Sequence, residues 1–229
     1  RPTALNQPVT SLTPQILAGI RHGRPLVGPS NVHIDVTNTC NAKCITCWDH
    51  SPLLTEPRTR AWKQQTLPWE RFEETLAALD RMGSCRAVVL SGMGEPLLHP
   101  RIYDMMKAIK ARGWHLTVLS NLVAAKIDAL IEAGVDNLLV GVHGATPVAY
   151  SAFHPGWDER QFATLCSHLR ALVRAGVTTR HVQVIDRNTA PDVVEMVRFG
   201  RRFRAERINY KLASLAAGTS RFMIHSASR

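Results

Sequence analysis

With 229 residues, of which 45% are hydrophobic and 20% charged, the chain has the composition of a globular protein and is long enough to bury a hydrophobic core. No run approaches the roughly 18 apolar residues of a membrane span, and the polar first residues lack the apolar stretch of a signal peptide. The formal net charge of +10 comes from scattered basic residues, without a basic run interleaved with aromatics. We therefore expect neither a membrane nor a nucleic acid as a partner.

The chain has five cysteines, an odd number that argues against a disulfide framework. This usage favours a reducing compartment, so we expect a cytoplasmic protein. Cys166 shares a helical face with Phe162, Leu165 and Leu169, which predicts a buried core thiol. Cys85 precedes an expected strand and receives no role.

The first 30 residues are expected to form an N-terminal arm. Thr13 is expected to cap a short helix there through Ile16, Leu17 and Ile20. From residue 31 to residue 212, short β-rich runs alternate with amphipathic helical patterns. The expected strands are 32–36, 87–90, 116–119, 138–142, 182–185 and 208–212, and the expected helices are 69–82, 102–109, 127–131, 162–172 and one that opens near Pro191.

This alternation predicts an α/β fold with parallel strands. Six strands are too few for a closed eight-unit barrel, and right-handed crossovers would curl them into a partial (β/α)6 barrel with outer helices. In such barrels, functional residues lie at the carboxyl ends of the strands. Residues 213–229 are expected to form a small, polar C-terminal tail, which could begin an extension that is missing from this chain.

Three cysteines follow the first expected strand, as Cys40, Cys44 and Cys47 in the run C-N-A-K-C-I-T-C-W. Thiolates hold iron–sulfur clusters, and a [4Fe–4S] cube has four irons. Three ligands would leave one iron open, and open metal positions are where chemistry takes place. A structural zinc site that adds His50 as a fourth ligand is an alternative, and a disulfide is another.

The cysteine spacing, with Trp48 directly after it, resembles that of the radical S-adenosylmethionine (SAM) superfamily. The resemblance extends over residues 31–212 and implies a partial (β/α)6 barrel. It also implies that Cys40, Cys44 and Cys47 hold a [4Fe–4S] cluster, whose fourth iron binds SAM. Trp48 would then be the aromatic residue near adenine, although a core aromatic is the alternative.

The turn after the second expected strand contains Gly92, Gly94, Glu95 and Pro96. It resembles the Gly-Gly-Glu-Pro motif of the superfamily, with Met93 in place of the first glycine. The glycines would let the backbone approach the cofactor closely. The resemblance implies that this turn binds the methionine part of SAM, with Glu95 accepting from the amino group.

Further candidates follow the next strands. Ser120 and Asn121 resemble a Thr-Asn-Gly motif, with Leu122 replacing the glycine, and are assigned to the SAM carboxylate or ribose; a helix N-cap is the alternative. His143 stands where Ser-x-Asp-Gly is frequent and would contact the cofactor or substrate, unless it is a structural histidine. Gln183 and Lys211 are candidates for contact with adenine or substrate.

The segment of residues 51–65 between the cysteines and the first barrel helix is long and contains proline, arginine and tryptophan. Long insertions of this kind are often functional. We predict that this segment roofs the site or contacts the substrate.

The resemblance implies a radical SAM enzyme, an oxidoreductase that reductively cleaves SAM to a 5′-deoxyadenosyl radical, which abstracts hydrogen from a substrate. Similarity to the branch with a SPASM-type extension makes a peptide or protein a candidate substrate, and the chemistry implies an external electron donor such as flavodoxin or ferredoxin. Two alternatives stay open at this point: a zinc-stabilised binding module that uses Cys40, Cys44, Cys47 and His50, and an iron–sulfur electron-transfer protein that does not bind SAM.

Overall fold

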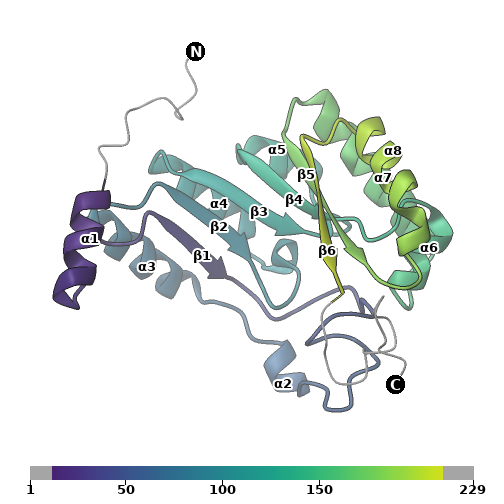
Figure 1. Ribbon diagram of the computed structural model, residues 1–229, viewed down its shortest axis with the longest axis horizontal. Helices are drawn as coiled ribbons and strands as arrows, with labels where there is room; N and C mark the ends of the chain where they lie inside the picture. The colour runs from purple at the N-terminus through teal and green to yellow at the C-terminus, as the bar shows by residue number, and fades with distance from the viewer. Residues whose placement is uncertain (1–11, 214–229) are drawn as a thin grey trace.

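The computed structural model describes residues 12–213 and shows one six-stranded sheet with helices beside it (Figure 1). The strands are parallel throughout and lie in the order β1-β2-β3-β4-β5-β6, so each strand pairs with its successor in the chain. Their bounds are β1 (Asn31–Asp35), β2 (Ala87–Ser91), β3 (His115–Ser120), β4 (Asn137–Gly141), β5 (Thr179–Ile185) and β6 (Arg207–Leu212). This arrangement confirms the predicted α/β fold.

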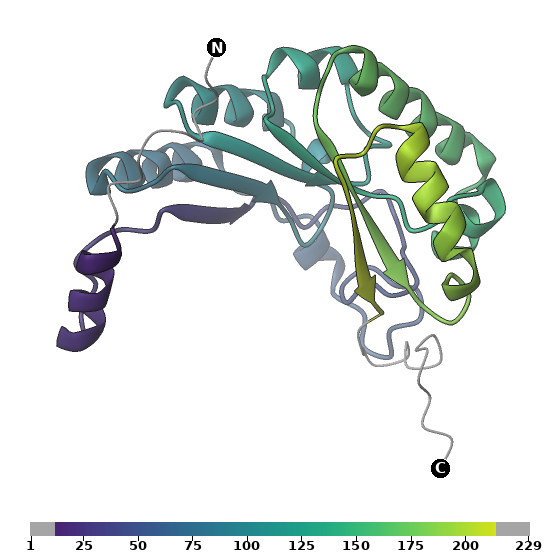
Figure 2. The ribbon, with the colours of Figure 1, turned by 45° about the horizontal axis from the view of Figure 1, so that its top comes forward.

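The helices within residues 69–202 connect the strands and lie on the outer side of the curved sheet (Figure 2). On β3, Leu116 and Val118 are fully buried, whereas Thr117 and Leu119 on the opposite face are only half-buried. The hydrophobic core therefore lies between the sheet and its helices, and the sheet forms part of a barrel. The helices are α1 (Thr13–His22), α2 (Arg60–Lys63), α3 (Trp69–Met82), α4 (Ile102–Ala111), α5 (Ile127–Glu132), α6 (Pro147–Phe153), α7 (Glu159–Arg174) and α8 (Val193–Arg202), with 3-10 turns η2 (Pro96–Leu98) and η3 (Ala190–Asp192).

Helix α3 shows why the barrel helices were predictable from sequence. Its buried side chains, Phe72, Leu76 and Leu79, recur at the spacing of one helical face. Pro68 precedes the first turn, and Gly83 ends the helix with a φ of 66°, a conformation that glycine adopts without steric cost.

Two short helices were not predicted, α2 and α6. In both, a threonine side chain caps the first turn: the Thr59 hydroxyl oxygen accepts from the backbone of Trp62, and that of Thr146 accepts from Ala149. The predicted cap of α1 was wrong, because Thr13 lies inside the helix and Leu12 holds the N-cap position without a side-chain hydrogen bond.

The predicted domain boundaries stay predictions, and residues 1–11 and 214–229 of the arm and tail lie outside the described residues. Cys166 is 7% exposed, which confirms the predicted core thiol, and Cys85 is buried as well. Within residues 12–213, none of the helices has the length and apolar character that a bilayer crossing demands.

Candidate cluster and cofactor site

The cysteine loop follows β1 and lies near the carboxyl ends of the strands. Figure 1 shows α2 near the same ends. Cys40, Cys44 and Cys47 are free and half-buried. Backbone N–H groups point at two of the sulfurs: Ala42 donates to Cys40 Sγ at 3.4 Å, and His50 donates to Cys47 Sγ at 3.2 Å. Hydrogen bonds of this kind orient thiolate ligands and tune the clusters that they hold.

Burial dominates the electrostatics of Cys40 and Cys44. It raises the pKa of Cys40 to about 12, and it also raises the pKa of Cys44, with a further contribution from the neighbouring cysteines. The Cys40 and Cys44 thiols are therefore neutral on their own at pH 7. A bound metal reverses this preference, because a coordinating thiol is deprotonated outright.

The cysteine loop does not hold a ready-made mononuclear zinc site within the described residues. Zinc needs all its ligands within about 2.3 Å of one point, and among the described residues no three histidine, cysteine, aspartate or glutamate side chains converge in that way. The ring of His50 instead lies 6.2 Å from that of Trp62. The donor set of three free cysteines fits an iron–sulfur cluster, because thiolates are the ligands that hold such clusters.

Three hydrogen bonds tie the cysteine loop to distant parts of the chain. Ile45 N donates to the carbonyl oxygen of Phe153 at the end of α6, at 3.0 Å. The indole of Trp157 donates to the carbonyl oxygen of Asn41 at 3.1 Å. The Asn41 side chain accepts from Asn121 Nδ2, at the end of β3, at 2.8 Å. These three bonds fix the position of the loop relative to α6, β3 and Trp157.

The glycine turn after β2 packs against the chain that leads from β1 into the cysteine loop. A Cβ atom at Gly94 would lie 2.1 Å from the carbonyl oxygen of Thr39, and one at Gly92 would lie 2.4 Å from that of Thr37. The backbone of Gly94 donates to Thr37 O at 3.0 Å, and that of Glu95 donates to Thr39 O at 2.8 Å. Glycine is required here because two backbone segments touch.

The carboxylate of Glu95 joins the ends of β2 and β3. Its side chain is 3% exposed, Oε1 accepts from Ser120 Oγ at 2.7 Å and from Leu97 N at 3.1 Å, and Oε2 accepts from Asn121 N at 2.7 Å. Burial raises the pKa of Glu95, and these three hydrogen bonds act in the opposite direction. A carboxylate oxygen has room for more than one donor, so Oε2 keeps acceptor capacity. Pro96 is buried and opens the turn η2.

Ser120 and Asn121 make local bonds as well as the bonds to Glu95. Ser120 Oγ accepts from Leu122 N at 2.8 Å, and Asn121 Oδ1 accepts from Val123 N at 3.0 Å. Leu122, at the position of the motif's glycine, is fully buried with a φ of 66°. The N-cap alternative was wrong, because Lys126 holds that position of α5.

His143 continues the sheet where β4 ends. Its φ is 53°, and its Nδ1 accepts from the backbone N–H of Val184 at 3.2 Å. Burial, with His154 and Lys211, lowers the pKa of His143 to about 3, so the ring is neutral at pH 7. The ring also packs against Phe153, with 4.7 Å between centroids. These contacts give His143 a structural role, and its contact with cofactor or substrate stays a prediction.

The remaining candidates are Gln183, Trp48 and Lys211. Gln183 is fully buried on the same side of β5 as His181, whose ring lies 5.8 Å from that of Phe199 on α8. Gln183 therefore lies on the helix side of the sheet. Trp48 is 61% exposed, and Lys211 is exposed on β6. Their roles in cofactor or substrate binding stay predictions.

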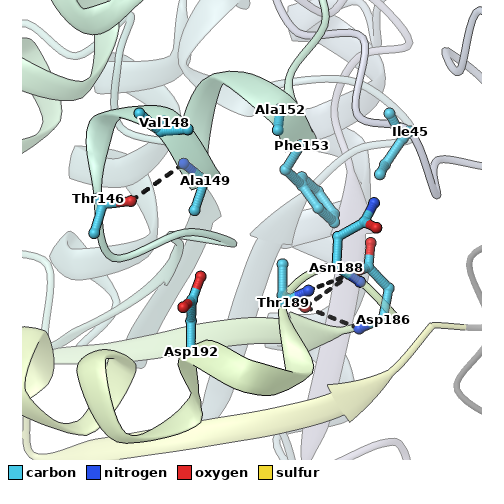
Figure 3. A pocket seen from close by; sticks show the side chains of 10 residues that line it. All are labelled: Ile45, Thr146, Val148, Ala149, Ala152, Phe153, Asp186, Asn188, Thr189 and Asp192. Carbon is cyan, nitrogen blue, oxygen red and sulfur yellow. Dashed lines mark hydrogen bonds between the residues drawn. The ribbon is translucent and has the colours of Figure 1, made fainter.

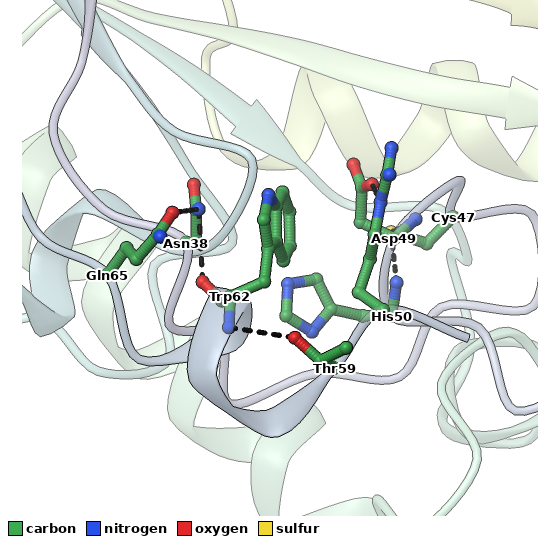
Figure 4. A network of polar contacts seen from close by, with 8 residues as sticks. Asn38, Cys47, Asp49, His50, Thr59, Trp62 and Gln65 are labelled. Atoms are coloured by element: carbon green, nitrogen blue, oxygen red, sulfur yellow. Dashed lines mark hydrogen bonds and ion pairs between the residues drawn. The ribbon is translucent and has the colours of Figure 1, made fainter.

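Residues 51–65 fold against both ends of the cysteine loop (Figure 4). Arg58 Nε donates to Asp49 Oδ1 at 2.7 Å, and its guanidinium lies 5.1 Å from the Trp62 ring centroid. Asn38 Nδ2 donates to Trp62 O at 3.1 Å, and Thr39 Oγ1 donates to Lys63 O at 3.1 Å. The segment is therefore anchored beside the site, and its predicted role as a roof is a proposal.

A polar row on β1 and β2 was not foreseen. Ser91 Oγ donates to Asp35 Oδ1, and His33 Nε2 contacts the same Ser91 oxygen. The hydroxyl has one proton and gives it to Asp35, so it accepts from His33 and is not activated as a nucleophile. The parallel register, which sets Ser91 beside Asp35, is what brings the three together.

A part-barrel of parallel strands with a three-cysteine loop at its carboxyl edge defines a class of cluster-dependent enzymes. The family model described as "Radical SAM superfamily" matches residues 34–200, well over half of the chain. The chain belongs to the radical SAM superfamily. Members of this family are enzymes that use a [4Fe–4S] cluster and SAM.

Relatives of known activity match in part. The chain is 33% identical over 129 residues to a GTP 3′,8-cyclase of Chlorobaculum tepidum, covering 54% of this chain and 35% of the relative. It is 28% identical over 116 residues to a PqqA peptide cyclase of Ruegeria pomeroyi, covering 49% of this chain and 29% of the relative. The chain thus spans about a third of the length of these curated relatives.

Solved structures share the fold. Streptococcus suis SuiB bound to S-adenosylmethionine superimposes with a TM-score of 0.70 at 16% identity, covering 92% of this chain and 46% of SuiB. The structure of anSMEcpe with bound AdoMet gives a TM-score of 0.68 at 15% identity, covering 86% of this chain and 54% of that one. These similarities confirm the partial barrel.

Proposed function

We propose that this chain is the catalytic core of a radical SAM enzyme that modifies a peptide or protein. The observation that carries the proposal is the set of hydrogen bonds through Glu95, Asn121 and Asn41. These bonds connect the ends of β2 and β3 to the cysteine loop. Ligands in such barrels bind at this edge of the sheet, so the three cysteines and the glycine turn face the same region.

Each part of this edge has a task in the proposed reaction. Cys40, Cys44 and Cys47 would hold the cluster, which when bound supplies the electron that cleaves SAM and so releases the hydrogen-abstracting radical. The free acceptor capacity of Glu95 Oε2 suits the ammonium group of SAM. Gly92, Gly94, Ser120 and Asn121 would shape the cofactor site through the backbone and side-chain bonds described above, and residues 51–65 would limit access of water.

A peptide substrate is supported by what related proteins act on. One matched relative is a PqqA peptide cyclase, SuiB has been solved with its precursor peptide SuiA, and anSMEcpe with a bound peptide. The cluster needs an electron from outside the chain, and flavodoxin or ferredoxin is the expected kind of donor.

The proposal is tested by anaerobic cluster reconstitution, followed by reduction with dithionite in the presence of SAM and quantification of 5′-deoxyadenosine. We expect deoxyadenosine from the wild type, none from Cys44→Ala, and wild-type yield from Cys166→Ala, which removes a core thiol. Zinc instead of iron in the purified protein would indicate the binding-module alternative. A formed cluster without SAM binding would indicate an electron-transfer protein.

A further inference from the structure

A cavity of about 250 Å³ lies between helix α6 and the connection from β5 to α8 (Figure 3). Buried side chains form its floor, among them Ile45 of the cysteine loop and Phe153 of α6. Exposed residues such as Val148, which is 80% exposed, form its mouth. It is lined by Ile45, Thr146, Val148, Ala149, Ala152, Phe153, Asp186, Asn188, Thr189 and Asp192.

The charge of this cavity is opposite to that of the chain. The sequence has a formal net charge of +10, yet the cavity is lined by two aspartates, Asp186 and Asp192, and none of the described lining residues is lysine or arginine. Asp192 stands at the N-cap of α8 but makes no side-chain capping bond, so its carboxylate is not used by the helix.

One oxygen of Asp186 lacks a partner. Oδ1 accepts from Asn188 N, Thr189 N and Thr189 Oγ1 at 2.8, 2.8 and 3.0 Å, and so closes the turn after β5. Oδ2 has no hydrogen-bond partner among the described residues, although the side chain is fully buried. A buried carboxylate oxygen without a donor is costly, and a ligand with a positive donor would relieve that cost.

The remaining walls suit an aliphatic chain. Ile45, Ala149, Ala152 and Phe153 contribute apolar surface to the cavity. The volume is below the range of about 300–1,000 Å³ that is usual for whole small-molecule ligands. It is better matched to one long side chain with a cationic tip, whose methylene groups pack on apolar surface while the tip pairs with a carboxylate.

We propose that this cavity binds a lysine or arginine side chain of the peptide substrate, with Asp186 and Asp192 receiving its charge. The assignment of a peptide rests on the proposed function above. Because Ile45 lies between two of the cysteines, a peptide anchored here is held beside the cysteine loop. The cavity is then a specificity site, which selects a basic residue at a fixed place in the substrate.

The test uses fluorescein-labelled pentapeptides Gly-Ala-X-Ala-Gly, with lysine, arginine, norleucine or glutamate at X, and measures their binding to the reconstituted protein by fluorescence anisotropy. We expect the lysine or the arginine peptide to bind at least about tenfold more tightly than the norleucine peptide, since a charged hydrogen bond is lost. Equal binding of the lysine, arginine and norleucine peptides, or no binding of any, would overturn the proposal. A free diamine, 1,5-diaminopentane, serves as competitor; tighter binding of it than of the basic peptides would overturn the peptide assignment.

Variants locate the effect. Asp186→Asn keeps the oxygen that closes the turn and replaces the unpartnered one by an amide NH2, so the fold is expected to survive and the preference for a basic residue to fall to about twofold or less. Asp192→Asn is expected to weaken the preference partly, and Asp128→Asn, at an exposed position of α5, to leave it unchanged. A preference that persists in both Asp186→Asn and Asp192→Asn would refute the site.

The failure of this inference is distinguishable from failure of the proposed function. Formation of deoxyadenosine by the wild type, without any peptide, tests the radical SAM chemistry alone. The ratio of the affinities for the lysine and norleucine peptides tests the cavity alone.

Discussion

Replacing Glu95 by glutamine tests whether a buried carboxylate holds the ends of β2 and β3 together. Glutamine keeps one acceptor oxygen for Ser120 and Leu97, but its NH2 group would face the N–H of Asn121, which is a donor. A lost hydrogen bond to a charged group is worth about 1.5–3 kcal/mol, and an unpartnered buried donor costs about 1–3 kcal/mol. Removing a buried charge offsets part of this, because burial raises the pKa of Glu95. We expect Glu95→Gln to lower the free energy of unfolding by about 2 kcal/mol.

The assay is urea unfolding of the metal-free protein at pH 7, followed by far-ultraviolet circular dichroism. With a slope of about 2 kcal/mol per M, the midpoint should fall by about 1 M without a change in slope. Asp128→Asn, on the surface of α5, is the control and should stay within about 0.5 kcal/mol of the wild type. If Glu95→Gln also stays within about 0.5 kcal/mol of the wild type, the carboxylate does not hold the ends of β2 and β3 together.

Three further changes test other contacts. Trp157→Phe removes the bond to Asn41 but keeps the aromatic ring, so stability should fall by about 1 kcal/mol and iron bound per chain should decrease; unchanged iron content would contradict the bracing role. Burial lowers the pKa of His181 to about 4, below about 6.5 when unfolded, so the native state binds fewer protons and stability is lost as pH falls from about 6.5 to 4. His181→Leu should reduce this loss of stability by up to about 3 kcal/mol, as measured by urea midpoints between about pH 6.5 and about pH 4. An unchanged pH dependence of the midpoint would contradict the burial of a neutral His181. Arg58→Met leaves the Asp49 carboxylate, 9% exposed, without its partner, so the free energy of unfolding should fall by about 1 kcal/mol. Adding Asp49→Asn should restore that stability, and a double variant no more stable than Arg58→Met would contradict the ion-pair role.

The barrel was predictable because its helices and strands carry local signals. In α3, the spacing of Phe72, Leu76 and Leu79 and the stop at Gly83 are all visible in a window of fifteen residues. Helix α6 has no such periodic signal. Its seven residues make fewer than two helical turns, which is too short for apolar residues to recur on one face. Its Tyr150 is fully buried, and the Tyr150 ring lies 5.4 Å from that of Phe162 on α7, a contact that forms only in the folded chain.

The site was predictable to the extent that spacing and strand ends determine it. The three cysteines and the glycine turn are short motifs at expected strand ends, so their common location followed from the parallel topology. The pairing of Asn41 with Asn121 did not follow, since it depends on the geometry of two loops that are 80 residues apart. The side of β5 on which Gln183 lies did not follow either, because the sequence shows alternation along β5 but not which side faces the helices.

The order of contacts around the cysteine loop has a consequence for biosynthesis. The cysteines belong to the first connection of the barrel, but the residues that brace their loop come later, Asn121 by 80 positions and Trp157 by 116 positions from Asn41. Because a chain emerges from the ribosome from its N-terminus, the thiols are made well before the structure that positions them. Cluster insertion into an ordered loop therefore has to wait until translation has passed Trp157, and the growing chain carries three unprotected thiols until then.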